Sequence, residues 1–179
     1  MKSSTRALLI GAMLALSLIR SAAAAEWTLS GRVVAPQGRR HLRNARRQDA
    51  APHPHRGIDA PERRQPYGNA SKDSLSRLVF NRNVEARCYK RDRYGRNVCR
   101  VFTREGGKDV GLEMVRAGLA WWFREYAKEQ TPEEQGAYQG AEDAARMTKR
   151  GLWKEPKPVP PWEWRRQQAL ESHARRGSR

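Results

Sequence analysis

Residues 83–103 have the sequence NVEARCYKRDRYGRNVCRVFT, and this stretch decides the fold. Apolar and polar side chains alternate over 83–90 and again over 97–103, which is the period of a half-buried strand. The segment between them, Asp92-Arg93-Tyr94-Gly95, is typical of a turn. The stretch therefore predicts a hairpin of two antiparallel strands.

The chain has two cysteines, Cys88 and Cys99, and they flank this turn. Two strands that meet at the turn bring the sulfur atoms close together. A disulfide that closes the hairpin is therefore the preferred interpretation, and two unpaired, partly buried thiols are the alternative. The Cys-x2-Cys spacings of a zinc site are absent from the sequence.

Further strands and helices are predicted on both sides of the hairpin. Residues 27–34 (WTLSGRVV) are typical of a first strand, and 71–81 carry apolar residues at helical spacing, with Ser71 as the expected cap. Asp109 is expected to cap a short helix. Strands followed by helices indicate an α+β domain.

A longer helix is predicted to begin at Thr131-Pro132-Glu133-Glu134, which has the spacing of a capping box. Gly151 is expected to end this helix, and Leu152-Trp153 to fold back onto the body. The helix is expected to turn a row of small residues inward: Ala137, Ala141, Ala144, Ala145 and Thr148.

The two ends of the chain differ from the 26–153 domain between them. Lys2 and Arg6, an apolar run over 8–19 and alanines at 22–25 form the pattern of a signal peptide over 1–25. We therefore expect a secreted or periplasmic protein without stable membrane association after cleavage, although Arg20 leaves an uncleaved anchor as the alternative. The tail 154–179, rich in Pro, Trp and Arg, is expected to be extended and partly disordered.

The charge of the chain favours an anionic partner. Thirty-six Lys and Arg stand against nineteen Asp and Glu, which gives a net charge of +17. Nucleic acid is the common partner of such a chain, because neutralising phosphates releases counterions and drives binding. A solvated basic surface without a partner is the alternative.

Three motifs are candidates for chemistry: Gly57-Ile58-Asp59-Ala60-Pro61-Glu62, Asp92-Arg93-Tyr94-Gly95-Arg96 and GLEMVRAGLAWW at 111–122. Taken singly, each motif is better explained without a function: the first as an ordinary turn, the second as a basic hairpin tip and the third as an amphipathic helix. Together, in this order and with a late Gly-Leu-Trp, they resemble the staphylococcal nuclease family from about Gly31 to Trp153, with a gap at 35–56. The resemblance implies an OB-type five-stranded β-barrel with three helices and a groove for single strands.

The resemblance also implies calcium-dependent cleavage of phosphodiester bonds in DNA or RNA. Asp59 resembles the aspartate that binds calcium, and the Ala60 carbonyl a second ligand. Glu62 resembles the general base, and Arg96 one catalytic arginine. These residue types suit the chemistry, because calcium prefers hard oxygen ligands and a guanidinium matches phosphate oxygens bidentately.

A weaker part of the resemblance concerns the nucleic acid itself. Arg93, Tyr94 and Tyr126 are expected to hold a flanking phosphate or base. Trp121 and Trp122 either stack on bases or, as the preferred interpretation, pack in the core. We expect a monomer.

Residues 35–56 depart from the family pattern. In the family this region supplies an Asp-Gly-Asp-Thr motif with another calcium carboxylate, and a strand with the second catalytic arginine. Here it contains one Leu, no Val, Ile, Phe, Tyr or Trp, six Arg and three His (His41, His53 and His55). We therefore predict that the segment forms no regular packed strands, so the first barrel strands are disrupted. A divergent basic loop or a histidine metal site are the alternatives, and the spacing matches no known metal site.

A frameshift explains this segment better. Read one base later, Gln-Gly-Arg-Arg-His-Leu at 37–42 can encode Arg-Asp-Gly-Asp-Thr. The stretch 48–56 can likewise encode Lys-Thr-Leu-Arg-Leu-Ile-Arg-Ile-Ala, after which the present frame resumes at Gly57. Both missing motifs return in the right order, and the restored stretch alternates as a strand does.

Three functions remain open on the sequence. The first is a calcium-dependent nuclease, impaired in this polypeptide by the 35–56 segment. The second is a non-catalytic OB-fold nucleic-acid-binding protein, and the third is a basic cell-surface binding protein. Glu62 and Arg96 together favour descent from an enzyme, because a binding protein does not need both.

Overall fold

The computed structural model describes residues 26–34, 57–92, 95 and 97–177. In chain order the elements are β1 (Trp27–Arg32), β2 (Ile58–Asp59), α2 (Gly68–Val79), β3 (Asn83–Arg91), β4 (Asn97–Thr103), α3 (Val110–Arg116), β5 (Trp121–Trp122), the 3-10 helix η1 (Arg124–Glu129), α4 (Pro132–Met147), the 3-10 helix η2 (Gly151–Lys154) and α5 (Pro161–Gly177). This mixture is the expected α+β class. Within the described ranges, no helix is both long enough and apolar enough to cross a membrane.

The strands form two open sheets. One has the order β1-β3-β4 and the other pairs β2 with β5, and all pairs are antiparallel. A closed five-stranded barrel is therefore not formed by the described residues, because β2 and β5 pair only with each other over two residues each. The prediction about 35–56, like the signal peptide at 1–25, lies outside the described residues.

The predicted hairpin is confirmed as β3 and β4. Its register places Cys88 directly opposite Cys99, and the Sγ atoms form a disulfide of 1.97 Å with the Cα atoms 3.9 Å apart. Both cysteines are buried in a cluster with Val84, Ala86 and Val101. The hairpin thus turns one apolar face toward α2 and α3.

Two of the predicted helix starts are confirmed. The Asp109 carboxylate accepts hydrogen bonds from the backbone N–H groups of Gly111 and Leu112 at the start of α3. Thr131 and Glu134 form the capping box of α4. Ser71 is not a cap, because α2 begins three residues earlier, at Gly68; its buried hydroxyl donates instead to the Leu119 carbonyl at 2.7 Å.

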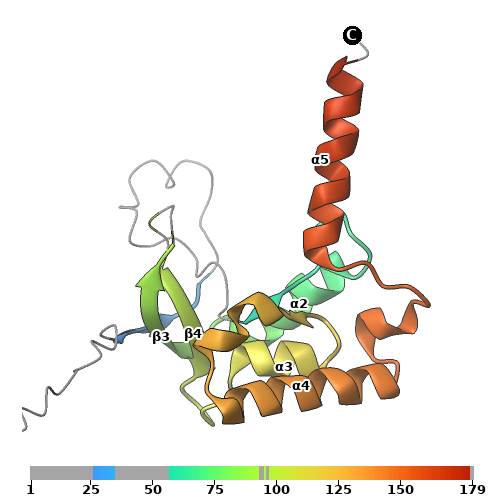
Figure 1. The fold of residues 1–179 in the computed structure, drawn as a ribbon. Coiled ribbons are helices and arrows are strands. Elements are labelled where there is room, and N and C mark those ends of the chain that lie inside the picture. The colour runs from blue at the N-terminus through green and yellow to red at the C-terminus, as the bar shows by residue number, and fades with distance from the viewer. Residues whose placement is uncertain (1–25, 35–56, 93–94, 96, 178–179) are drawn as a thin grey trace, which may run out of the picture.

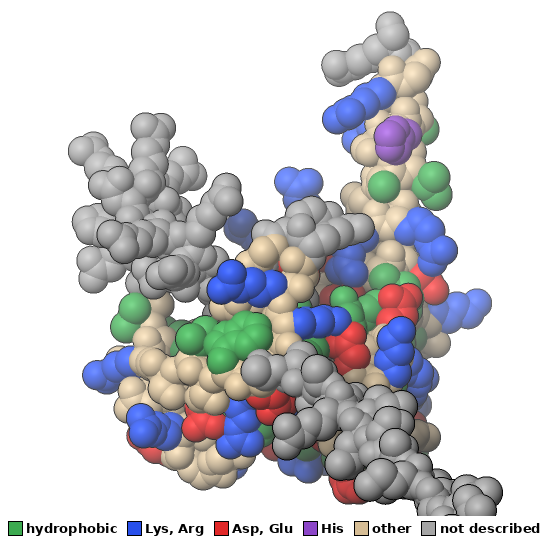
Figure 2. Space-filling model, turned by 60° about the vertical axis from the view of Figure 1, so that its left-hand side comes forward, with side chains coloured by type: hydrophobic (Ala, Val, Ile, Leu, Met, Phe, Trp, Pro, Cys, Tyr) green, Lys and Arg blue, Asp and Glu red, His purple; other side chains and the backbone are tan. Residues whose placement is uncertain are grey.

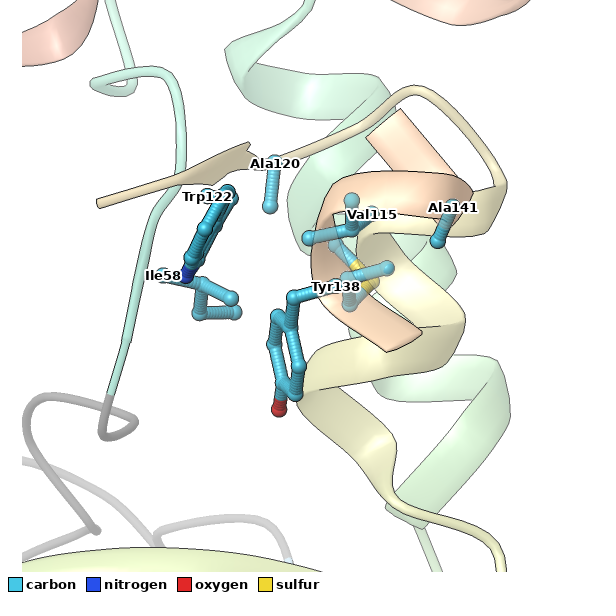
Figure 3. Packing of buried hydrophobic residues seen from close by; sticks show 7 residues of the cluster. Ile58, Val115, Ala120, Trp122, Tyr138 and Ala141 are labelled. Carbon is cyan, nitrogen blue, oxygen red and sulfur yellow. The ribbon is translucent and has the colours of Figure 1, made fainter. Parts of the chain in front are cut away.

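The inward face of α4 differs in part from the expected row. Ala141 and Ala145 are buried as predicted, but Ala137, Ala144 and Thr148 are exposed. Tyr138 and Glu142 are buried in their place, with 1% and 0% of their surfaces exposed. Figure 3 shows this core, in which Ile58 of β2 lies beside Trp122 of β5 and Tyr138 faces them from α4.

Two glycines from separate motifs meet where α3 ends and η2 begins. Gly118 and Gly151 both have positive φ, 64° and 53°. A Cβ on Gly118 would lie 2.3 Å from the Arg150 carbonyl oxygen, and one on Gly151 would lie 2.1 Å from the Gly118 carbonyl oxygen. Only glycine fits at either position. The contact seats Leu152 and Trp153 in the core, as predicted for this Gly-Leu-Trp segment.

The expectation of an extended tail is wrong for residues 161–177, which form α5. Pro161 begins the helix, where its missing N–H costs nothing, and the Arg, Gln, Ala, Leu and Glu residues after it are good helix formers. Pro161 is fully buried, and the Trp162 ring lies 5.8 Å from the Trp121 ring. Beyond this docked first turn, α5 projects away from the body, with the C-terminus at its far end (Figure 1).

Candidate nuclease site

The Asp-Ala-Pro-Glu segment leaves the edge of the small β2–β5 sheet. Ile58 pairs with Trp122 and is buried, while Asp59 pairs with Trp121 and is partly exposed. The Phe123 backbone N–H donates to the Gly57 carbonyl at 2.8 Å, which extends the pairing by one residue. Because successive residues of a strand point to opposite faces, burying Ile58 turns the Asp59 carboxylate to the other face of the sheet, where its side chain is 19% exposed.

Backbone contacts hold Glu62 against the start of α2. Its N–H donates to the Gln65 side-chain oxygen at 3.1 Å, and its carbonyl accepts from the Gln65 N–H at 2.8 Å. A Cβ on Gly68 would lie only 2.0 Å from the Glu62 carbonyl oxygen, so the helix can approach this closely only with glycine there. The Glu62 side chain remains 43% exposed.

An arginine from α5 joins the two predicted carboxylates. Arg165 donates from Nη2 to Asp59 Oδ2 at 2.7 Å and from Nη1 to Asp59 Oδ1 at 3.3 Å. The same Nη1 donates to Glu62 Oε1 at 2.8 Å. The oxygens of Asp59 and Glu62 thus converge on one positively charged group.

The electrostatics of Asp59 reflect its position at the edge of the core. Burial raises the pKa of its carboxyl group above the ordinary value, and this effect outweighs the hydrogen bond from Arg165, which lowers it. The hydrogen bond to Asp59 raises the pKa of the Arg165 guanidinium, which stays charged. The guanidinium therefore places a permanent positive charge beside the two carboxylates.

The donor set can be compared with the needs of a calcium ion. Asp59 and Glu62 offer hard carboxylate oxygens that already face a common cation, and Ala60 lies between them in the chain. These donors suit calcium in kind, but calcium takes six to eight oxygens. Among the described residues, no group of three or more His, Cys, Asp or Glu is placed to hold a metal. The described residues thus offer two carboxylates of the kind that calcium prefers, which are fewer donors than the ion takes.

The remaining predicted residues are distributed as follows. Tyr126 lies in η1, partly buried, with its ring 5.4 Å from that of Phe123 and with Lys90 Nζ 5.1 Å from its ring centre. Trp121 and Trp122 are buried, 7% and 5% exposed, in agreement with the packing interpretation. Three predicted residues lie outside the described residues: Arg93, Tyr94 and Arg96. The same is true of His41, His53 and His55.

Three residues that support this site were not predicted from the sequence: Arg165, Gln65 and Glu142. The Glu142 carboxylate accepts from the Trp122 backbone N–H at 3.1 Å and forms ion pairs with Arg124 and Arg146. Glu142 therefore fixes β5, the strand that pairs with β2 and so positions Asp59. The run of good helix formers after Pro161 was the one local signal for α5, and no local signal pointed to its contact with Asp59.

The face of the molecule drawn in Figure 2 carries many positive charges. Figure 2 shows Lys and Arg side chains over the body and along the projecting helix, with acidic side chains between them. This distribution suits a phosphate backbone better than a neutral ligand.

Comparisons with known proteins agree with this geometry. The family described as "Staphylococcal nuclease homologue" matches residues 55–155, more than half of the chain. A protein of Escherichia coli O157:H7 named "Uncharacterized endonuclease" is 41% identical over 108 residues, which are 60% of this chain and 66% of the relative. A protein of Haemophilus influenzae with the same name is 35% identical over 113 residues, 63% of this chain and 59% of the relative.

A plant relative extends the comparison. A "Probable staphylococcal-like nuclease" of Oryza sativa subsp. japonica is 34% identical over 139 residues, 75% of this chain and 40% of the relative. The chain thus spans less than two thirds of the length of each of these three relatives. The match over 55–155 includes the Asp-Ala-Pro-Glu segment, the hairpin and the Gly118–Gly151 contact. The chain belongs to the staphylococcal nuclease family.

Proposed function

We propose that this protein is a calcium-dependent nuclease that hydrolyses phosphodiester bonds of DNA or RNA, and that this polypeptide performs the reaction poorly. The observation that carries the proposal is the convergence of Asp59 and Glu62 on one cation position. Membership of the family and the names of its endonuclease relatives support the same reaction class. Within the α+β class, we propose that the fold is the OB-type barrel of the family.

Each predicted site residue has its own role in the proposed reaction. Asp59 and the Ala60 carbonyl would hold calcium, which would polarise the phosphate when bound. Glu62 is exposed enough to take a proton from an attacking water, as a general base. Arg96 would meet charge that develops on the phosphate oxygens, and Arg93, Tyr94 and Tyr126 would hold the adjoining nucleotides.

The impairment follows from what 35–56 does not supply. Asp59 and the Ala60 carbonyl alone leave calcium short of ligands, and the second arginine of the family is missing from the sequence. We attribute both losses to a pair of frame changes that bound this segment. The family match begins at residue 55, close to Gly57, where the present frame resumes, and this supports the attribution.

The cellular setting is part of the proposal. The pattern at 1–25 supports export, and the Cys88–Cys99 disulfide suits an oxidising compartment. We therefore place the protein outside the cell or in the periplasm, as a monomer free of the membrane after cleavage.

The test is cleavage of plasmid and single-stranded DNA with calcium and with a chelator. We expect slow cleavage that requires calcium and falls at least about 100-fold in Glu62→Gln. Glu105→Gln, at an exposed position in the turn after β4, is the matched control and should cleave as the unmodified chain does. Cleavage that Glu62→Gln leaves unchanged would contradict the proposal. Salt-dependent DNA binding without cleavage would favour the non-catalytic binding protein.

A further inference from the structure

Arg165 lies outside the matched range 55–155, yet it donates hydrogen bonds to both predicted site carboxylates. We propose that Arg165 is an exchangeable cation of the nuclease site. It holds Asp59 and Glu62 while no metal is present, and it passes to a nucleic-acid phosphate when a divalent cation takes the carboxylates. This inference rests on the proposed function.

The position of Arg165 is built into the fold. Gln65, which is 6% exposed, donates from its side-chain amide to the Val159 carbonyl at 2.5 Å. Pro161 is fully buried, and the Trp162 ring lies 5.1 Å from the Phe123 ring. Arg165 follows one turn later, so the anchored segment delivers its guanidinium to the carboxylates.

The guanidinium and a metal ion, both positively charged, compete for the same carboxylate oxygens. Arg165 uses both oxygens of Asp59 and one of Glu62. A calcium ion at these hard oxygens would bring a second positive charge beside the guanidinium, and the repulsion between the two favours departure of the guanidinium. The Arg165 side chain is 49% exposed, and it therefore has solvent into which it can move.

The charges of the site indicate where the guanidinium goes. Two carboxylates and Arg165 together carry a net charge of −1. If a divalent cation binds the two carboxylates and Arg165 stays beside the site, the net charge of the four groups becomes +1. One phosphodiester group neutralises that charge, and a guanidinium pairs well with phosphate oxygens. Arg165 therefore couples binding of the metal to binding of the nucleic acid.

The experiment measures calcium affinity by isothermal titration calorimetry on the full chain. Each variant is titrated with Ca2+ alone and again with a phosphorothioate single strand that resists cleavage. The variants are Arg165→Gln and Arg166→Gln. Arg166→Gln removes the same charge from an exposed neighbouring position. It therefore controls for the electrostatic effect of losing one positive charge near the site.

Without the oligonucleotide, we expect Arg165→Gln to bind Ca2+ about three to ten times more tightly than the unmodified chain, as suits removal of a half-exposed ion pair. Arg166→Gln should stay within about twofold of the unmodified chain, because only the screened field of an exposed charge is lost. The oligonucleotide should raise Ca2+ affinity in the unmodified chain and in Arg166→Gln, and distinctly less in Arg165→Gln.

Equal Ca2+ affinity of Arg165→Gln and Arg166→Gln would overturn the inference while leaving the proposed function intact. Undetectable Ca2+ binding in every variant, together with no cleavage, would overturn both. Circular dichroism establishes that each variant is folded. If Arg165→Gln fails to fold, Arg165→Lys serves in its place, because an ammonium cannot pair bidentately with Asp59. It should also bind Ca2+ more tightly than the unmodified chain, and unchanged affinity would again overturn the inference.

Discussion

Gln65 is joined to Val159, 94 residues later in the chain, by a hydrogen bond of 2.5 Å from its side-chain amide. The oxygen of the same amide accepts from the Glu62 N–H at 3.1 Å. One buried side chain thus connects the Asp-Ala-Pro-Glu segment to the tail that carries Arg165. The carboxylates and the arginine are held in place from a common point.

Replacing Gln65 should therefore loosen the tail before it affects the rest of the fold. In Gln65→Ala the Val159 carbonyl and the Glu62 N–H lose their partner, which should cost about 1–3 kcal/mol. Hydrogen exchange over residues 156–165 measures the effect, and faster exchange there is the expected result. Gln168→Ala, at an exposed position on α5, should leave the exchange unchanged. Equal protection in the two variants would show that the amide does not hold the tail.

The buried carboxylate of Glu142 should be a major source of stability. Glu142→Ala leaves the Trp122 N–H without its acceptor and removes the partner of Arg124 and Arg146. Because both arginines are about half exposed, the expected loss is about 2–3 kcal/mol, below that of a fully buried pair. Urea unfolding gives the value. Asp143→Ala, one residue away and exposed, should change stability by less than about 0.5 kcal/mol.

The Gly118–Gly151 contact should tolerate no side chain. Gly118→Ala combines a positive φ with a Cβ that would lie 2.3 Å from a carbonyl oxygen, so a loss of about 2 kcal/mol or more is expected. Gly140→Ala on α4 is the matched control, because its Cβ would meet nothing within 4 Å. Alanine in that exposed helical position should raise stability by about 0.5–1 kcal/mol. Thermal unfolding compares the stability of the two variants. A Gly118→Ala variant as stable as the unmodified chain would contradict the close contact of Gly118 with Arg150.

The disulfide should stabilise the hairpin by restricting the unfolded chain. The two cysteines are separated by 11 residues, and a loop of that size gives about 2–3 kcal/mol. A dithiothreitol titration of the unmodified chain should lower its midpoint of unfolding. The double variant Cys88→Ala/Cys99→Ala should show no response to the reductant. Identical midpoints with and without reductant in the unmodified chain would contradict the prediction.

The sequence was informative where the signals were local. The Asp109 cap and the Thr131 capping box depend on residues within three positions of one another, and the β3–β4 hairpin on the one continuous stretch 83–103; all three were predicted. The inward face of α4 was only partly predicted, because burial of a charged Glu142 depends on Trp122 and two arginines elsewhere in the chain. The composition of the tail, rich in Pro, Trp and Arg, predicted an extended backbone, whereas residues 161–177 form the helix α5.

The candidate site likewise contains residues that a local motif predicts and one that only the structure reveals. Asp59 and Glu62 could be named because they stand in one short motif, and the structure brings their oxygens to one point. Arg165 could not be named, because it reaches Asp59 across 106 residues and no spacing in the sequence reports that contact. Contacts of this kind arise from tertiary packing.

The central claim is that this polypeptide carries an incomplete calcium nuclease site and that restoring the reading frame across 35–56 completes it. The most direct measurement compares two chains that begin at residue 26, the present sequence and its frame-restored form, in cleavage of DNA with calcium and with chelator. The restored chain should cleave at least about 100-fold faster, in a strictly calcium-dependent way, because it regains a calcium carboxylate and an arginine. Equal calcium-dependent rates in the two chains would contradict the account.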